Sequence, residues 1–193
     1  MKIHKLNMKK VKFLKTKFKD LYRVQREPFI DKRGTFVNLF QQEFVKYFKL
    51  EGSKSQINFS FNKSKGILRG MHIQTPPYAE KKLITCVQGS VFDVVIDLRK
   101  KSKTFLKFYS EILNANDFNS LLVPEGFAHG YQVLEDNTQL VYIHSNNYNK
   151  RFEKGVNSLD PVFGINWPLE KKIISDKDSC VKYLSANFNG FEI

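Results

Sequence analysis

The sequence has few cysteines, few acidic residues and no long apolar run, and each shortage excludes a class of protein. Its 193 residues include two cysteines, Cys86 and Cys180, which lie far apart and form no CxxC pair. A disulfide framework or a zinc site is therefore not expected. No segment approaches the roughly 20 apolar residues that span a bilayer, and the N-terminus lacks the apolar segment of a secretion signal. We expect a cytoplasmic protein without a membrane partner.

Acidic residues are outnumbered by basic ones, 19 to 32, which gives a net charge of +13. A basic protein raises the possibility of a nucleic-acid partner. However, the first 20 residues hold eight of the lysines against one acid, Asp20, without the interleaved aromatic residues of a single-strand groove. We interpret residues 1–11 as a basic N-terminal extension and expect no nucleic-acid partner. A positive surface also attracts nucleotide diphosphates.

The length and the apolar pattern favour one all-β domain over residues 1–193. Short β-branched and aromatic runs recur, separated by Asn, Asp and Gly, as in KLITCVQGSVFDVVIDLR, TFLKFYSEIL, SLLVPEGFAHGYQVL and TQLVYIHSNNY. Regular short strands with turn signals predict a sandwich or barrel. Short helices are expected at its periphery. One has Phe40, Phe44, Val45 and Phe48 on one face, and another lies beyond about Ser158.

Two stretches share a pattern that ends in a histidine. GILRGMH leads to His72, and SLLVPEGFAH leads to His129 through a Pro-x-Gly turn. They resemble the two motifs of the cupin superfamily, whose jelly-roll β-barrels hold ligands or metals in the barrel mouth. Metal-binding cupins carry His-x-His in the first motif, but here Gln74 stands at the second position and lysines follow Glu80. Because Gln is a poor ligand and lysine repels a divalent ion, we expect a site without metal or other cofactor.

Further blocks extend the resemblance to most of the chain. They are FIDKRGTF, QINFSFNKSKGILRGMHIQTPPYAEKKLI, GSVFDVVIDLRKKSKTF, LLVPEGFAHGYQVL, LVYIHSNNYN and DPVFGINWP followed by SDKD. In this order and spacing, from about residue 12 to 178, they are similar to the family of dTDP-4-dehydrorhamnose 3,5-epimerases. The resemblance implies a cofactor-independent isomerase. It would invert carbons beside the C4 ketone of a nucleotide-linked 4-keto-6-deoxy sugar, for surface or capsular polysaccharide synthesis.

The resemblance also assigns roles to residues. His72 aligns with the base, Asp178 with the carboxylate that orients it, Tyr142 with the acid on the opposite face and Lys82 with the cation near the enolate oxygen. The implied substrate-binding residues are Arg33, Phe36, Gln56, Asn58, Arg69, His129, Glu153 and Lys177. In the family the positions of Arg33 and Phe36 contact the nucleotide across a dimer interface, which implies a homodimer.

Several alternatives stay open on the sequence. Tyr142 also suits an ordinary strand, and Asp178 suits a helix cap or an exposed tail. Asn38 and Glu80 depart from the common family residues, so the substrate is either a dTDP-hexose or a GDP-heptose, and inversion involves C3 alone or both C3 and C5. A sugar-nucleotide 3,4-ketoisomerase and a non-catalytic ligand-binding cupin are the other functions considered.

Overall fold

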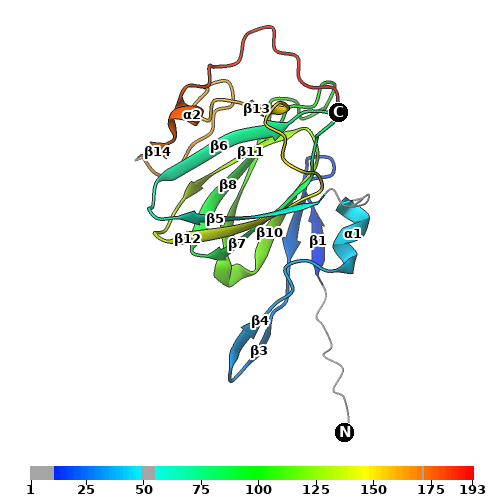
Figure 1. The fold of residues 1–193 in the computed structure, drawn as a ribbon, viewed down its shortest axis with the longest axis vertical. Coiled ribbons are helices and arrows are strands. Elements are labelled where there is room, and N and C mark those ends of the chain that lie inside the picture. Colours follow the sequence, from blue (N-terminus) through cyan, green and yellow to red (C-terminus); the bar gives the residue numbers. More distant parts are fainter. Residues whose placement is uncertain (1–10, 49–54, 171) are drawn as a thin grey trace.

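Two facing β-sheets form the body of the protein, which is described here by a computed structural model of residues 11–48, 55–170 and 172–193 (Figure 1). The first sheet has the order β1 (Lys12–Lys15), β2 (Tyr22–Gln25), β10 (Asn119–Val123), β7 (Lys82–Gln88), β12 (Thr138–His144) and β5 (Gln56–Asn62). The second has the order β13 (Glu153–Gly155), β6 (Ile67–Gln74), β11 (Phe127–Val133), β8 (Ser90–Asp97) and β9 (Phe108–Asn114), with β14 (Ile173–Ile174) beside β6. The predicted all-β, jelly-roll fold with short helices is confirmed.

The main core lies between the two sheets. Strands of the first sheet contribute Ile84, Cys86, Leu121 and Leu140, and strands of the second contribute Val91, Val95, Leu113 and Val133, all at most 3% exposed. β-branched and long aliphatic side chains at alternate strand positions form this layer, as the sequence pattern predicts. The core fills part of the space between the sheets, and a cavity occupies another part.

The outer face of each sheet is covered by a different segment. Helix α1 (Gln42–Phe48) packs Phe44 and Phe48 against Leu83 and Leu122 of the first sheet. The predicted placement of Val45 on this buried face is wrong: its side chain is 43% exposed, because it follows Phe44 by one residue and points about 100° away. The chain beyond Gly155, including Phe163, Trp167 and Phe188, covers the outer face of the second sheet.

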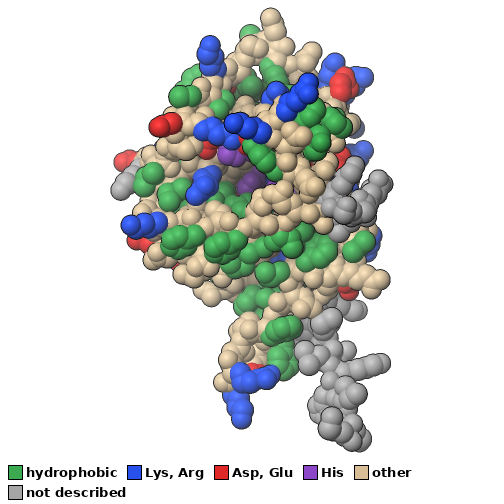
Figure 2. All heavy atoms as spheres, in the orientation of Figure 1, with side chains coloured by type: hydrophobic (Ala, Val, Ile, Leu, Met, Phe, Trp, Pro, Cys, Tyr) green, Lys and Arg blue, Asp and Glu red, His purple; other side chains and the backbone are tan. Residues whose placement is uncertain are grey.

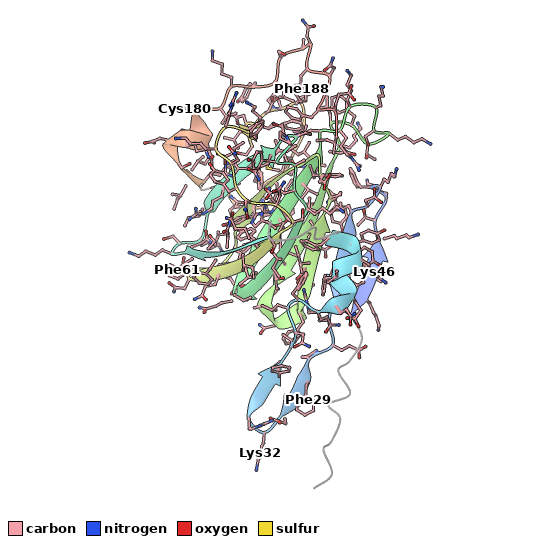
Figure 3. The ribbon with its side chains drawn as sticks, turned by 45° about the vertical axis from the view of Figure 1, so that its right-hand side comes forward. Phe29, Lys32, Lys46, Phe61, Cys180 and Phe188 are labelled. Carbon is pink, nitrogen blue, oxygen red and sulfur yellow. The ribbon has the colours of Figure 1, made fainter. Side chains whose placement is uncertain are left out.

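A hairpin, β3 (Phe29–Asp31) and β4 (Gly34–Phe36), projects from the body (Figures 1 and 3). Gly34, with φ of +124°, provides the turn that the sequence predicts. The hairpin carries apolar residues that its own chain leaves exposed: Phe29 at 44%, Ile30 at 68% and Phe36 at 56%. It therefore offers an apolar surface well away from the core of its own chain.

Strands β6 and β11 approach each other closely at two glycines. A Cβ on Gly70 would lie 2.6 Å from the carbonyl oxygen of His129, and a Cβ on Gly130 would lie 2.6 Å from the carbonyl oxygen of Arg69. The register between these strands shifts at Gly130, and His72 stands directly opposite His129. The two glycines therefore bring the histidines of both sequence motifs to one place.

The N-terminal extension lies mostly outside the described residues. Of residues 1–11, only Val11 is described, and it packs against the cluster under α1, so it belongs to the fold. Along the parts of the chain that the structure describes, no helix is long and apolar enough to cross a membrane.

The close approach of β6 and β11 predicts the effect of Gly130→Ala. A methyl group there meets backbone at 2.6 Å, so we expect the free energy of unfolding to fall by about 1–3 kcal/mol in urea denaturation. Gly164→Ala is the control, because Gly164 has a positive φ of +63° but no atom within 4 Å of an added Cβ. Its cost is about 1 kcal/mol of backbone strain. A smaller loss for Gly130→Ala than for Gly164→Ala would contradict this account of the packing.

Candidate active site

A cavity of about 510 Å³ opens between the two sheets, and side chains of β5, β6, β7, β11 and β12 line it. Seven of the predicted site residues line it: Asn58, Arg69, His72, Lys82, His129, Tyr142 and Glu153. Figure 2 shows the hollow, with histidine side chains inside it, Lys and Arg along its upper edge and a band of hydrophobic side chains below it. The structure thus brings most of the predicted residues to one enclosure.

His72 and Asp178 form a hydrogen-bonded pair at the cavity wall. His72 lies on β6, and its Nε2 is 2.7 Å from Oδ1 of Asp178, whose Oδ2 accepts the backbone N–H of Gly70 at 3.1 Å. Burial raises the pKa of Asp178, but the bonds from His72 and Gly70 outweigh it and hold the pKa below 3.8. The ionised carboxylate therefore accepts a hydrogen bond from Nε2–H of His72, and Nδ1 of His72 keeps the lone pair that can accept a proton.

Asp178 is placed by the short helix α2 (Asp176–Ser179). Ser175 caps this helix, and its hydroxyl oxygen accepts the backbone N–H of Asp178 at 3.2 Å. The Asp178 side chain points inward and is only 6% exposed. Ser175, not Asp178, is therefore the capping residue, and the alternatives of a cap or an exposed tail residue do not apply to Asp178.

His129 has its own carboxylate. Its Nε2 lies 2.8 Å from Oδ2 of Asp93 on β8, and Asp93 is fully buried. Burial raises the pKa of Asp93, while the neighbouring His129 opposes that change. Oδ1 of Asp93 has no hydrogen-bond partner in the described structure. The bond from His129 to Oδ2 is therefore what stabilises this buried carboxyl group.

Tyr142 stands across the cavity from His72, because it lies on β12 of the first sheet whereas His72 lies on β6 of the second. Burial, followed by the neighbouring Tyr131, raises the pKa of Tyr142 well above 10. The phenol is therefore protonated at neutral pH. Its ring contacts those of His129 and His144, with centroids 6.1 Å away in both cases, which fixes its orientation.

Lys82 belongs to a buried group of charges that the sequence analysis did not identify. Its Nζ lies 3.2 Å from Oε1 of Glu80, whose Oε2 lies 2.8 Å from Nδ1 of His144. All three side chains are at most 11% exposed and line the cavity. The only sign of this group in the sequence was Glu80, because it departs from the residue that is common in the family. His144 is separated from Lys82 by 62 positions, and only the pairing of β12 with β7 brings them together.

The remaining predicted residues lie at the rim or away from the cavity. Gln56 is at the rim, where it donates to Asn58 at 2.7 Å. Lys177 does not line the cavity but bonds the lining residue Glu153 at 2.7 Å. Arg33, paired with Asp31, and Phe36 lie on the projecting hairpin and do not line this cavity of their own chain.

Gln74 has a structural role in the first motif. Its amide oxygen accepts the backbone N–H of Asn149 at 2.6 Å, and its amide nitrogen donates to the carbonyl of Asn147 at 3.2 Å. Both polar ends of the side chain therefore hold the loop that follows β12.

Known proteins are similar to this chain in fold and in sequence. The family model described as dTDP-4-dehydrorhamnose 3,5-epimerase matches residues 15–186. An enzyme of that name from Shigella flexneri is 39% identical over 178 residues, covering 91% of this chain and 97% of its own. The Bacillus anthracis epimerase structure, with TDP and PPi bound, is 35% identical with a TM-score of 0.85 and covers 91% of this chain and 100% of its own. The Legionella pneumophila epimerase structure in complex with dTDP-4-keto-L-rhamnose is 32% identical with a TM-score of 0.84, over 90% and 93% of the two chains.

Fold and sequence together define a sugar-nucleotide epimerase, which is an isomerase. More narrowly, the chain belongs to the dTDP-4-dehydrorhamnose 3,5-epimerase family.

The lowered pKa of Asp178 predicts a pH-dependent contribution to stability. Unfolding returns the carboxyl to about 3.8, so its stabilising effect is complete above that pH and is lost as the pH falls through the lower native value. Asp178→Asn should therefore reduce the free energy of unfolding at pH 7. The difference in this free energy between the variant and the unmodified protein should become smaller below pH 4. Urea denaturation across this range measures both proteins. Asp176→Asn is the matched control on the exposed side of α2, and a gap for Asp178→Asn that is constant with pH would contradict the pairing.

Proposed function

We propose that the cavity inverts carbons beside the C4 ketone of a nucleotide-linked 4-keto-6-deoxy sugar, with no cofactor. The observation that carries this proposal is the opposed pair of proton carriers. A base held by a carboxylate, His72 with Asp178, faces a buried protonated phenol, Tyr142, across one enclosure. Epimerisation needs this arrangement, since a proton leaves one face of the ring carbon and another arrives on the opposite face.

The first step is proton removal at C3 or C5. The C4 carbonyl acidifies these C–H bonds because the electron pair that is released delocalises onto its oxygen as an enolate. His72 takes the proton on Nδ1, and the resulting imidazolium is stabilised by the ionised Asp178 through Nε2. Lys82, with its ammonium at the cavity wall, is the donor assigned to the enolate oxygen.

The second step is protonation from the other face. The raised pKa of Tyr142 keeps its proton available at neutral pH, and the phenol gives that proton to the enolate carbon as the carbonyl re-forms. The inverted sugar leaves, His72 gives the proton that it took to solvent, and Tyr142 regains a proton from solvent. Arg69, His129 and Glu153 are the cavity residues assigned to binding the substrate, with Lys177 at the rim.

For the substrate, we favour a dTDP-linked hexose over a GDP-linked heptose. The named relatives are dTDP-sugar enzymes, and one is bound to dTDP-4-keto-L-rhamnose. Arg69 in the cavity lining and Lys177, which bonds the lining residue Glu153, suit a diphosphate, and Figure 2 shows Lys and Arg along the upper edge of the hollow.

A homodimer would complete the site. Ile57, Phe59 and Phe61 lie 49–70% exposed on β5, the edge strand of the first sheet, and the hairpin carries a second exposed apolar set. In Figure 3, Phe61 lies at the edge of the barrel and Phe29 on the distant hairpin. We propose that these surfaces meet in two copies of the chain, so that Arg33 and Phe36 of one copy reach the cavity of the other.

Deuterium exchange tests the proposed chemistry. Incubation of 4-keto-6-deoxy sugars linked to dTDP or GDP in D₂O should give deuterium at C3, or at C3 and C5, measured by NMR. His72→Ala should slow exchange by about 10²- to 10⁴-fold, and Tyr142→Phe should slow inversion. Tyr109→Phe is the control, because it removes a phenol that donates to Glu111 outside the cavity. It should change neither the exchange nor the inversion. If the unmodified enzyme took up no deuterium with either nucleotide sugar, the proposed epimerisation would be wrong. A product with its carbonyl at C3 would identify the enzyme as a 3,4-ketoisomerase.

The proposed dimer predicts the effect of Phe61→Glu. Sedimentation equilibrium should give twice the 22.6 kDa chain mass for the unmodified protein. A charge buried in the interface should weaken the dimer at least about tenfold, because an unpaired buried charge costs several kcal/mol. Val162→Glu changes an equally exposed apolar residue in a loop and should leave the dimer intact. A monomeric unmodified protein would contradict the proposal.

A further inference from the structure

Hydrogen bonds run in an unbroken chain along one wall of the cavity, from the Tyr148 backbone to the Lys82 ammonium. The backbone N–H of Tyr148 donates to Oε1 of Gln56 at 2.9 Å, and Nε2 of Gln56 donates to Oδ1 of Asn58 at 2.7 Å. The next bonds join Asn58 to His144, His144 to Glu80 and Glu80 to Lys82. We call Gln56, Asn58, His144 and Glu80 the relay.

The backbone at Tyr148 sets the direction of every bond in the relay. A backbone N–H can only donate, so Gln56 presents its oxygen to Tyr148 and its amide nitrogen to Asn58. Asn58 must then accept with its oxygen, which leaves its amide nitrogen facing Nε2 of His144 at 3.3 Å. That nitrogen also can only donate, so Nε2 of His144 is the acceptor.

The tautomer of His144 follows from this direction. With Nε2 accepting, the ring proton lies on Nδ1 and is donated to Glu80 at 2.8 Å. Both ring nitrogens are then occupied, so His144 has no lone pair for the substrate. This separates it from His72, whose Nδ1 keeps its lone pair, although both rings line the same cavity.

Glu80 is the branch point of the relay. Its side chain is 7% exposed, and burial alone would raise its pKa, but the charge of Lys82 and the bond from His144 hold the pKa below its usual 4.5. The carboxylate therefore stays ionised and binds two donors, one on each oxygen. Because Lys82 is bonded to a buried carboxylate that is itself fixed by His144, its ammonium has little freedom to move.

We propose that Glu80 and His144 are positioning residues that hold the Lys82 ammonium where the enolate oxygen forms. This inference rests on the proposed function, which assigns Lys82 to that oxygen. A donor that is fixed before the reaction stabilises developing charge without reorganising, and a shift of about 1 Å can cost 100-fold in rate. Glu80 and His144 thus act on the chemical step through Lys82 and touch no reacting atom.

Glu80→Gln tests the positioning role. The glutamine keeps the shape but has one oxygen where two donors need acceptors, so Lys82 and His144 cannot both stay bonded. We expect kcat to fall about 10- to 100-fold while KM changes by less than about threefold, measured as the rate of deuterium uptake. Glu111→Gln is the control, since it breaks a partly buried ion pair with Arg23 outside the cavity and should leave both constants unchanged. A Glu80→Gln enzyme with unchanged kcat would overturn the role.

The tautomer provides a readout that does not depend on activity. Two-bond ¹H–¹⁵N correlation of ¹⁵N-histidine-labelled protein should show a protonated Nδ1 and an unprotonated Nε2 for His144, assigned by its loss in His144→Phe. Glu80→Gln should shift these resonances, and Glu111→Gln should not. A protonated Nε2 in the unmodified protein would overturn the relay. If the unmodified enzyme exchanged no deuterium, the proposed function would be wrong. The histidine spectrum would still show whether His144 has the tautomer that the relay requires.

Discussion

The contact between β6 and β11 at Gly70 and Gly130 is the constraint on which the site depends. Side chains at either position would meet backbone of the facing strand, so the two strands lie close enough to set His72 beside His129. The same Gly70 donates its N–H to Asp178, which also holds His72. The strand contact, helix α2 and His72 are therefore parts of one arrangement. If α2 moved away from β6, His72 would lose its hydrogen bond to Asp178.

Each described histidine is paired with one carboxylate, and its surroundings distinguish its role. His72 with Asp178 is a third exposed and keeps one nitrogen open to the cavity, as a base requires. His129 with Asp93 is buried in the second sheet. His144 with Glu80 has both nitrogens occupied. His72 and His129 bind their carboxylates through Nε2, whereas His144 uses Nδ1 because the Asn58 amide occupies its Nε2.

The layers of the fold explain how the space between the sheets can hold these charges. Helix α1 and the chain beyond Gly155 cover the outer faces of the sheets, and the apolar core fills part of the space between them. Charged side chains in the remaining space bind each other, as His72 binds Asp178 and Lys82 binds Glu80. Two groups of exposed apolar side chains lie on β5, beside the cavity, and on the hairpin, away from the body, and these are the surfaces that the proposed dimer would cover.

Much of this was predictable from local sequence. Strand periodicity and the turn at Gly34 predicted the barrel, and the two histidine motifs singled out His72 and His129, because side-chain alternation and turn chemistry act over a few residues. The role of Lys82 came from the resemblance to the epimerase family. Val45 was misplaced because a short helix buries a narrower stripe than the sequence pattern indicated.

Contacts between distant segments were decided by the tertiary structure alone. The sequence determined which residues can carry a proton or a charge. Strand pairing decided that Glu80, Lys82 and His144 share one network, and sheet packing decided that Tyr142 faces His72. The burial of Asp178 depended on the docking of α2. The physical reason is that pKa, tautomer and orientation depend on through-space neighbours and on exclusion of water, and neither is encoded in spacing along the chain.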